Sequence, residues 1–416
     1  MIRTNTFEVA PRTDNAESML RRMLDASASL WNEINYERRQ RFFSGEDIWE
    51  SEEFYDRYVD VLGGATAQTI IRRNSDAWKS FFTLCDNPDE DPSPPGYWGN
   101  EDEGRDQRTY IRNDAYTLRW GERSRLEIRI GLDLKEEYGL GYYERLPLEV
   151  RGEPHWNGDS GRVTIEYDEL TETFPGYQSV TVPEDQQDAP LAQQTVAIDI
   201  GINTLAACTT TTGQQYRYDG IEIFEQFRET TEYIADLESK LPDDRSCSRR
   251  IKRLYRKRTR RRDHATAALI RDLVPRLHED GIDTVVIGDL SGGFGAKWTA
   301  EANEMIHNFW AYRKFNTQLE SVCEEYGIEV VTRSEAETSQ SCPDCGRTDT
   351  TTRHRDSLTC ICGFDGHADL AASRNLLNRA TEDSIPGPTA RPMRFQWDNH
   401  EWRSIRDASE TPTNSA

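Results

Sequence analysis

The sequence has no long apolar run, few cysteines and very little lysine. No stretch reaches the about 20 apolar residues that a membrane-spanning helix needs, so no membrane partner is expected. The first residues, MIRTNTFEVAPRTD, lack the apolar core of a secretory signal. Eight cysteines in 416 residues are too few for a disulfide scaffold, and four of them cluster. These absences predict a protein of the reducing cytoplasm.

Lysine supplies only seven of the 51 basic residues, and the formal net charge is -23. An acid-rich surface keeps a protein soluble where salt screens its self-repulsion. We therefore interpret the acidity as an adaptation to a salty cytoplasm, typical of a halophile. The alternative is an acidic protein that avoids nucleic acid, and the distribution of charge distinguishes the two.

One basic segment runs against this acidity. Residues 245–262, RSCSRRIKRLYRKRTRRR, contain eleven arginines or lysines and no acid, so the rest of the chain carries -34. An apolar stripe from Ile251 to Leu277 predicts one long helix, with Pro275 near its end. A basic run is often only a solvated face, but in so acidic a chain it favours a helix that contacts phosphates. The expected contact residues are Arg249, Arg250, Lys252, Arg253, Arg256, Lys257, Arg260 and Arg261.

The hydrophobic pattern divides the chain into several segments. Short alternating runs are typical of antiparallel strands in a small barrel, helical spacing indicates helices, and strands that alternate with helices indicate an α/β domain. The predicted segments are a β-barrel over 1–14 and 105–190, a helical domain over 15–104, an α/β domain over 191–335 and 364–380 with a basic helical insertion over about 222–280, a cysteine-rich ribbon over 336–363, and a loose, disordered tail over 381–416.

Four cysteines have the spacing of metal ligands, C-x2-C-x14-C-x-C. They are Cys342, Cys345, Cys360 and Cys362. Gly346 and Gly363 allow knuckle turns around an ion, and four thiolates suit a structural zinc with no open ligand position. The last pair is one residue closer than usual, so His354 or His367 could replace one thiolate. Four unrelated buried cysteines are the other interpretation.

Three aspartates stand at the ends of predicted strands or helices. Asp199 lies in the apolar strand TVAIDI, where a carboxylate is costly to bury unless it is paired or binds a cation. Asp369 begins a helix whose alanines can pack closely on a sheet, although an N-cap is the common use of an Asp there. Asp289 ends the run TVVIGD before a glycine turn. Each alone is equally consistent with a turn or cap.

Taken in order, these motifs resemble the TnpB/OrfB proteins of insertion sequences, relatives of the compact type V CRISPR effectors. The resemblance covers nearly the whole chain. It is carried by AIDIGINTLA (197–206), the basic helical insertion, IHNFWAYRKFNTQLESVCEEYGIEVV (306–331), TSQSCPDCG (338–346), CGFDGHADLAASRNLL (362–377) and, more weakly, SPPGYWGN (93–100).

This resemblance implies a RuvC-like, RNase H-like domain that holds two magnesium or manganese ions and is interrupted by helices and a zinc ribbon. A barrel with an inserted helical recognition domain would precede it. Asp199 corresponds to the first metal-binding acid of the family, and Asp369 to the last. The implied activity is RNA-guided cleavage of double-stranded DNA by metal-activated water, with guide RNA and target DNA as partners. We expect the protein to act either with a separate transposase or alone on DNA. The sequence leaves the oligomeric state open, and a monomer is the default.

The middle catalytic acid departs from the family pattern. The family has a Glu at the end of the strand before an aspartate-leucine pair, and this chain has Gly288 there. Strand alternation places Gly288 on the face of Val286 and Asp289 on the face of Ile287, so Asp289 is displaced by one residue. A glycine lets a strand end bend, and Asp289 is therefore the expected substitute.

Three functions stay open at this point. The first is an active guided endonuclease with Asp199, Asp289 and Asp369 as its metal-binding acids. The second is an RNA-guided DNA-binding protein with impaired cleavage, acting as a regulator or transposition accessory. The third is a zinc-stabilised protein without a nucleic-acid role, which the basic helix disfavours. The family is conventionally called a transposase, but no tyrosine recombinase signature is present, and strand transfer is not expected.

Overall fold

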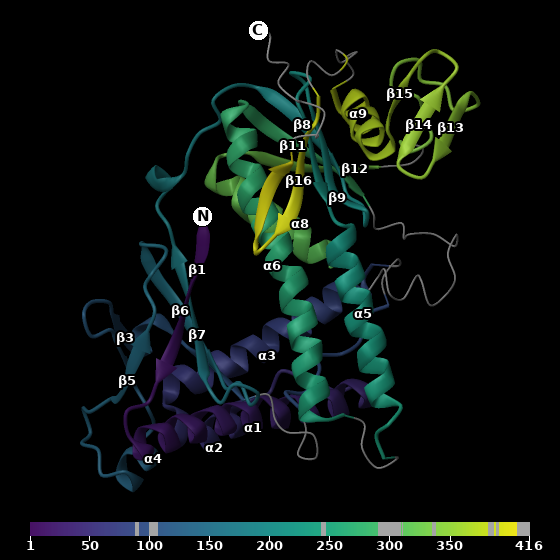
Figure 1. Cartoon of the computed structure of the whole chain (residues 1–416). Helices are drawn as coiled ribbons and strands as arrows, with labels where there is room; N and C mark the ends of the chain where they lie inside the picture. The colour runs from purple at the N-terminus through teal and green to yellow at the C-terminus, as the bar shows by residue number, and fades with distance from the viewer. Residues whose placement is uncertain are drawn as a thin grey trace. The chain divides into compact units, whose positions relative to one another are not determined.

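The chain forms two compact units, Met1–Glu184 and Asp185–Ala416 (Figure 1). No helix within the described residues is long and apolar enough to cross a membrane. The side chain of Asp289 lies outside the description. The computed structural model describes residues 1–87, 91–99, 107–242, 247–289, 309, 311–334, 338–381, 387 and 391–405.

Unit 1 is built on an antiparallel sheet that curls into a nearly closed barrel. Its first strand pairs with two strands that come more than 130 residues later, so the N-terminal segment lies in the middle of the sheet. In spatial order the strands are β2 (Arg108–Ile111), β6 (Asp159–Glu166), β7 (Phe174–Thr181), β1 (Ile2–Ala10), β5 (Leu146–Arg151), β4 (Arg125–Ile128) and β3 (Tyr116–Arg119).

Three helices are inserted between β1 and β2, and a short one follows β4. The first begins at Thr13, whose side chain accepts a hydrogen bond from the amide of Ala16, and it ends at Gly45 in the left-handed conformation. Its apolar stripe packs against the barrel strands in one continuous core. The helices are α1 (Asp14–Ser44), α2 (Glu52–Leu62), α3 (Gly64–Cys85) and α4 (Leu132–Glu137).

The SPPGYWGN stretch is held by the first helix. Trp31 donates to the carbonyl of Gly96 at 3.0 Å, and Asn35 donates to that of Pro95 at 2.7 Å. The rings of Trp31 and Trp98 stack with 4.5 Å between their centroids. This proline-rich segment is therefore a structural strap across α1.

Unit 2 is built on a mixed sheet of seven strands. Three antiparallel neighbours are followed in the chain by two strands that run parallel to the first. In spatial order the strands are β12 (Glu329–Ser334), β11 (Ile282–Asp289), β8 (Gln194–Asp199), β9 (Thr204–Thr210), β10 (Gln215–Asp219), β16 (Met393–Asp398) and β17 (Glu401–Ile405). Among the described residues, the helices of this unit are α5 (Ile221–Glu238), α6 (Arg249–Glu279), α8 (Tyr312–Glu325) and α9 (Ala368–Thr381).

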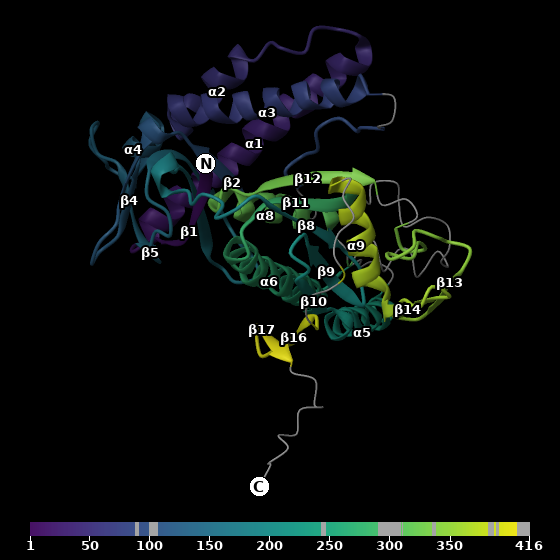
Figure 2. The same ribbon diagram turned by 90° about the horizontal axis from the view of Figure 1, so that it is seen from above.

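The two faces of this sheet carry different helices. Ile198 and Ile287 belong to the core that α6 and α8 complete. Their neighbours Ala197 and Val286 face the other way and pack against Leu376 of α9. Figure 2 shows α9 on one side of the strands and α6 on the other. Strand alternation thus assigns every residue at the end of β8 and β11 to one of two environments.

The predicted helical insertion, over about 222–280, spans α5 and the whole of α6, and the first half of α6 lies beside α5 (Figure 1). Ser248 starts α6 by accepting a hydrogen bond from the amide of Ile251. The second half of α6 is different, because Leu269, Leu273 and Leu277 are buried in the core of the sheet. One helix therefore contains both a surface segment and a core segment.

The predicted loose tail is wrong for residues 393–405. β16 pairs in parallel with β10 and antiparallel with β17, so this segment extends the sheet. Phe395 stacks on Tyr218 with 4.6 Å between ring centroids, and Trp402 donates to the carbonyl of Ala265 at 3.0 Å. Burial of two aromatic side chains supplies the driving force that a loose tail lacks.

A local signal for this hairpin is present in the sequence. Phe395 and Trp397 alternate with polar residues, and a two-residue turn follows. Both turn residues, Asn399 and His400, have positive φ, as the tight turns that match strand twist require. The acidic and proline-rich composition around the hairpin masks this signal.

We expect Trp402→Ala to lower the free energy of unfolding of unit 2 by about 3 to 5 kcal/mol, because it removes a buried indole and its hydrogen bond. Denaturant unfolding followed by circular dichroism measures this change. Arg403→Ala, at an exposed neighbouring position, is the matched control and should change stability far less. An unchanged unfolding curve for Trp402→Ala would restore the loose-tail interpretation.

Candidate functional site

The cysteine-rich segment folds as a small three-stranded sheet beside α9. Leu358 of this ribbon forms a core with Ala368 and Ala371 of the helix. The ribbon is thereby fixed to the first turn of α9. Its strands are β13 (Thr351–His354), β14 (Ser357–Cys360) and β15 (Asp365–His367).

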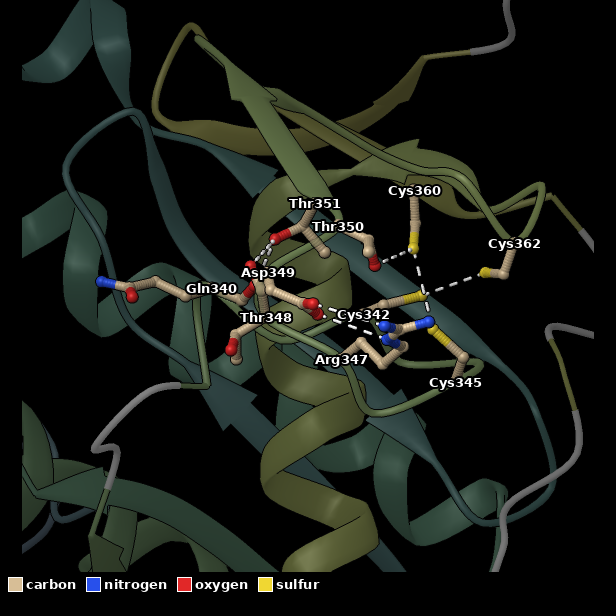
Figure 3. Close-up of polar contacts among 10 residues, drawn as sticks. All are labelled: Gln340, Cys342, Cys345, Arg347, Thr348, Asp349, Thr350, Thr351, Cys360 and Cys362. Carbon is tan, nitrogen blue, oxygen red and sulfur yellow. Dashed lines mark hydrogen bonds and ion pairs between the residues drawn. The ribbon is translucent and has the colours of Figure 1, made fainter.

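The four predicted cysteines converge at one end of the ribbon (Figure 3). Their sulfur atoms all lie within 4.8 Å of one another. The Sγ atoms of Cys342 and Cys362 are 3.5 Å apart, and those of Cys345 and Cys360 are 3.7 Å apart. A tetrahedral ion with metal–sulfur bonds of about 2.3 Å requires edges of about 3.8 Å between its ligands. The cluster can therefore hold a metal ion.

Glycines form the knuckles of the cluster. Gly346 donates to the carbonyl of Cys342 at 2.9 Å with a φ of +73°, and Gly363 donates to that of Cys360 at 3.0 Å with a φ of +103°. A side chain would strain both turns. The ligand set contains cysteines only. His367, considered above as a substitute ligand, instead accepts a hydrogen bond from the amide of Asp369 at 3.3 Å.

The cysteines differ in their electrostatic surroundings. Hydrogen bonds from the backbone amide of Cys362 and, to a smaller extent, from the hydroxyl of Thr350 lower the pKa of Cys360 to about 6. Burial raises the pKa of Cys342 to about 12. The Cys360 thiol therefore loses its proton more readily than the Cys342 thiol, and metal binding would displace the proton of Cys342.

Asp199 and Asp369 lie on the α9 side of the sheet. Asp199 ends β8, pairs with Ala207 of β9, and alternates with Ile198 so that it shares the face of Ala197. Asp199 is half-buried. Burial raises the pKa of the Cys208 thiol, and the negative charge of Asp199 raises it further. Asp369 lies in the first turn of α9, which packs directly on β8 and β9.

The ribbon reaches over this end of the sheet. Arg353 of β13 forms an ion pair with Asp369, with 3.1 Å between its Nη2 and Oδ1, and the carboxylate side chain is 15% exposed. Asp356 lies at the tip of the same hairpin. Its carbonyl accepts a hydrogen bond from the amide of Ala368 at 2.7 Å, and its carboxylate accepts one from the side chain of Asn203 at 3.5 Å. Asn203 belongs to the turn between β8 and β9. The hairpin therefore borders both predicted acids.

Two residues, Gly288 and Asp289, correspond to the middle acid of the predicted metal site. Val286 and Ile287 pair with Ala197 and Ile198, so Gly288 is level with Asp199 and on the same α9 face. The backbone of Asp289 pairs with Ser334 of β12, and its side chain lies outside the described residues. The cysteine cluster is the only group of three or more metal-ligating side chains in the described part of the chain.

Two family models match the sequence. OrfB_IS605, described as a probable transposase, matches residues 177–292, and the Cas12f1-like TNB domain matches residues 312–376. TnpB-like protein ORF457 of Acidianus two-tailed virus is 26% identical over 97% of this chain and 92% of its own length. Along nearly its whole length the chain is thus similar to a TnpB-like protein.

Solved structures show the same fold at low sequence identity. A Cas12f1 in complex with sgRNA and target DNA aligns with a TM-score of 0.61 and 12% identity over 88% of this chain and 84% of that protein. The mini-RNA-guided endonuclease CRISPR-Cas_phi3 aligns with a TM-score of 0.52 and 10% identity over 93% and 94%. These likenesses establish the mixed α/β architecture of this chain.

The basic helix α6 displays most of its predicted contact residues. Arg249, Arg250, Lys252, Arg253, Lys257, Arg260 and Arg261 are exposed, and Arg256 is half-buried. Arg258 and Arg262 turn inward instead. Arg258 lies 4.4 Å from the centroid of Phe227, and Arg262 pairs with Asp263 at 2.7 Å. The segment thus has a structural side and a charged side.

The sequence motifs do not reveal what fastens the ribbon to α9. Asn375 donates to the carbonyls of Thr338 and Ser341, both at 2.8 Å, and Arg374 pairs with Asp344 at 2.6 Å. Both residues lie in the quoted family motif, where the helical pattern alone indicates only a helix surface. Their anchoring role is a tertiary contact over about 30 residues of chain.

We expect Cys345→Ser to reduce the metal content from about one ion per chain to a small fraction, because it removes one of four ligands. Elemental analysis of the purified protein measures this. Cys85→Ser, at an exposed cysteine outside the ribbon, is the matched control. Equal metal content in both variants, or none in the wild type, would exclude the cluster as a metal site.

Proposed function

We propose that this protein belongs to the TnpB family and is an RNA-guided DNA endonuclease of the TnpB/Cas12 type whose cleavage is weakened at the middle acid. The observation that carries the proposal is that Asp199 and Asp369 share one face of an RNase H-like sheet. Cas12f1, which has the same fold, was solved with sgRNA and target DNA. Guide RNA and a double-stranded DNA target are accordingly the proposed partners.

The charged side of α6 supports a nucleic-acid partner. Seven exposed cations in the first half of one helix are costly to hold together unless a polyanion binds them, and the rest of this protein is acidic. Arginine and lysine contacts to phosphates are the sequence-independent component of nucleic-acid affinity. This surface is suited to hold a guide or its heteroduplex while base pairing supplies specificity.

The two carboxylates suit magnesium or manganese, because hard oxygen donors are the ligands that these ions prefer. Two such ions, when bound, supply an activated water and steady the leaving oxygen of a phosphodiester. Asp199 would hold them from the strand end and Asp369 from the helix. Asp369 also binds Arg353, so an ion must compete with a guanidinium for this carboxylate.

Gly288 is the reason to expect weak cleavage. Gly288 lies level with Asp199 on the α9 face of the sheet, at the position where the family has a carboxylate, and it has no side chain to bind an ion. Asp289 is one residue further on, and we propose it as a substitute ligand that the strand end would have to turn inward. A missing ligand leaves one ion with fewer anionic contacts and so lowers its occupancy.

The four-cysteine cluster is proposed to hold zinc in a structural role. A closed set of four thiolates leaves no position for water or substrate. Its place against the first turn of α9 means that the ion would also stabilise the position of Asp369.

A second function is favoured by Gly288 itself. A protein that keeps guided binding but lacks cleavage would act as an RNA-guided regulator or as a transposition accessory. The same fold and the same basic surface serve both functions, and only the metal site distinguishes them.

We expect Gly288→Glu to raise guided cleavage by about tenfold or more, because it adds a carboxylate on the face of Asp199. The protein is copurified with its RNA and given a matching plasmid with varied flanking sequences, magnesium and high salt. Adding Asp199→Ala to Gly288→Glu is the control and should abolish the gained activity.

The same assay separates the hypotheses. Fast cleavage by the wild type that Asp289→Ala abolishes would show that Asp289 is a full substitute and that the site is not weakened. Guided binding without cleavage, in the wild type and in Gly288→Glu alike, would support the regulator. Cleavage that survives Asp199→Ala would exclude this metal site.

We expect replacement of Arg253, Lys257 and Arg260 by Gln to weaken RNA binding and to reduce its salt dependence. On duplex DNA the slope of log K against log salt becomes shallower by roughly 0.9 for each phosphate that the protein no longer neutralises. Titrations at several salt concentrations measure this slope. Replacing Arg228, Lys240 and Arg403 by Gln removes the same charge elsewhere and is the matched control. Equal slopes for both triple variants would show that α6 is only a solvated face.

A further inference from the structure

Unit 1 contains a cavity of about 510 Å³ that the proposed function does not use. It lies where the turn between α2 and α3 meets α4 and the segment that leads into β5. The end of α2 and the start of α4 are in direct contact, because the amide of Gly131 donates a hydrogen bond to the carbonyl of Val61 at 3.0 Å. A Cβ atom at Gly131 would lie 2.1 Å from the carbonyl oxygen of Asp60. The cavity is therefore a fixed feature of this unit.

The cavity is basic in an acidic protein. Arg129, Lys135 and Arg145 line it, and Glu144 is its one acid. None of the three cations forms an ion pair with a residue that the structure describes. Lys135 is only 8% exposed, and its ammonium donates to the carbonyl of Tyr142. Glu144 accepts instead from the backbone amide of Gly141. A buried cation without a carboxylate partner favours binding of an anion.

A comparison with the other large cavity of this unit shows that this balance is not general. That cavity, of about 660 Å³, is lined by Glu33, Glu37 and Glu53 as well as by Arg41 and Arg57. Arg57 pairs with Glu33 and Glu53, both at 2.6 Å, so its charges compensate one another. In the basic cavity Glu144 is the only acid among the lining residues, and no ion pair joins it to Arg129, Lys135 or Arg145.

The N-terminus of α3 faces the same cavity. Gly63, Gly64 and Thr66 line it, and no side chain caps this helix. The first amides of a helix lack intrahelical acceptors and favour an anion. Independently, Thr66 is 1% exposed, and its Oγ1 has no hydrogen-bond partner in the described residues. An unpartnered buried hydroxyl beside three cations indicates a missing ligand atom that can accept a hydrogen bond.

Two tyrosines stand at the rim. Tyr142 and Tyr143 are 67% and 91% exposed, with 5.0 Å between their ring centroids. Aromatic side chains left in solvent beside cations are the arrangement on which unpaired bases stack. The volume suits one nucleotide and is far too small for a duplex.

We propose that this cavity binds one phosphate of a single-stranded nucleic acid segment, with an adjacent unpaired base stacked on Tyr143. Arg129, Lys135 and Arg145 neutralise the phosphate, and the amides of the first turn of α3 with the Thr66 hydroxyl donate to its oxygens. The proposal rests on the proposed function for its ligand class, but on a different unit and on different residues.

The test measures binding of a fluorescent five-nucleotide RNA, and of the DNA of equal sequence, by anisotropy with the full-length protein. The background carries Gln at Arg253, Lys257 and Arg260, so that α6 does not contribute. Arg145→Gln should weaken binding by about tenfold. Tyr143→Ala should weaken it by about 5- to 100-fold, and the fold should tolerate this change because the side chain is exposed. Tyr36→Ala, an exposed tyrosine in the compensated cavity, is the matched control.

Photocrosslinking with bromouridine in the same oligonucleotide gives a second readout. Crosslinks that map to residues 142–145 support the proposal, and preference for RNA or DNA identifies the source of the strand. Affinity unchanged by both substitutions, with crosslinks only elsewhere, would overturn it. If inorganic phosphate displaces the oligonucleotide and the oligonucleotide never crosslinks to the protein, the cavity is a site for free phosphate. That result would also overturn the proposal. Guided DNA binding that fails while these crosslinks persist refutes the proposed function alone.

Discussion

The close packing of α9 on one face of the unit 2 sheet is the contact on which the candidate site depends. Ala197 and Val286 meet Leu376 and Leu377 there, and the small residues of the helix let it approach β8 and β9. Ser373 and Thr209 share a buried hydrogen bond of 2.7 Å across the same interface. Because Asp369 is in the first turn of this helix, the packing brings a residue from near the C-terminus to the strand that ends in Asp199.

The same helix carries the ribbon. Asn375 and Arg374 hold the segment around Cys342, while Ala368 and Ala371 complete the ribbon core with Leu358. Metal binding by the cysteines would therefore stabilise more than a peripheral loop, since the ribbon hairpin also places Arg353 on Asp369. The arrangement couples a candidate metal site to a candidate catalytic carboxylate through one helix.

Charge is distributed so that cations are concentrated where polyanions are expected. The basic half of α6 has no acid of its own before Asp263, and the cavity beside α3, in the other unit, has one. Elsewhere, exposed arginines pair with neighbouring acids, as Arg12 does with Glu149 and Arg41 with Glu37. At high salt such basic clusters retain affinity only by multiplying contacts, because each phosphate contact is weakened by counterions.

By itself the sequence determined the features that depend on local spacing. The knuckle geometry of Cys342 and Cys345, the charged side of α6 and the assignment of Gly288 to the face of Val286 all follow from residues a few positions apart. Tertiary structure alone decided the packing of the hairpin at Phe395 and Trp402 against the sheet core, the anchoring by Asn375 and the cavity at Thr66. These features join segments that are far apart in the chain, and burial against a distant partner outweighs local composition in forming them.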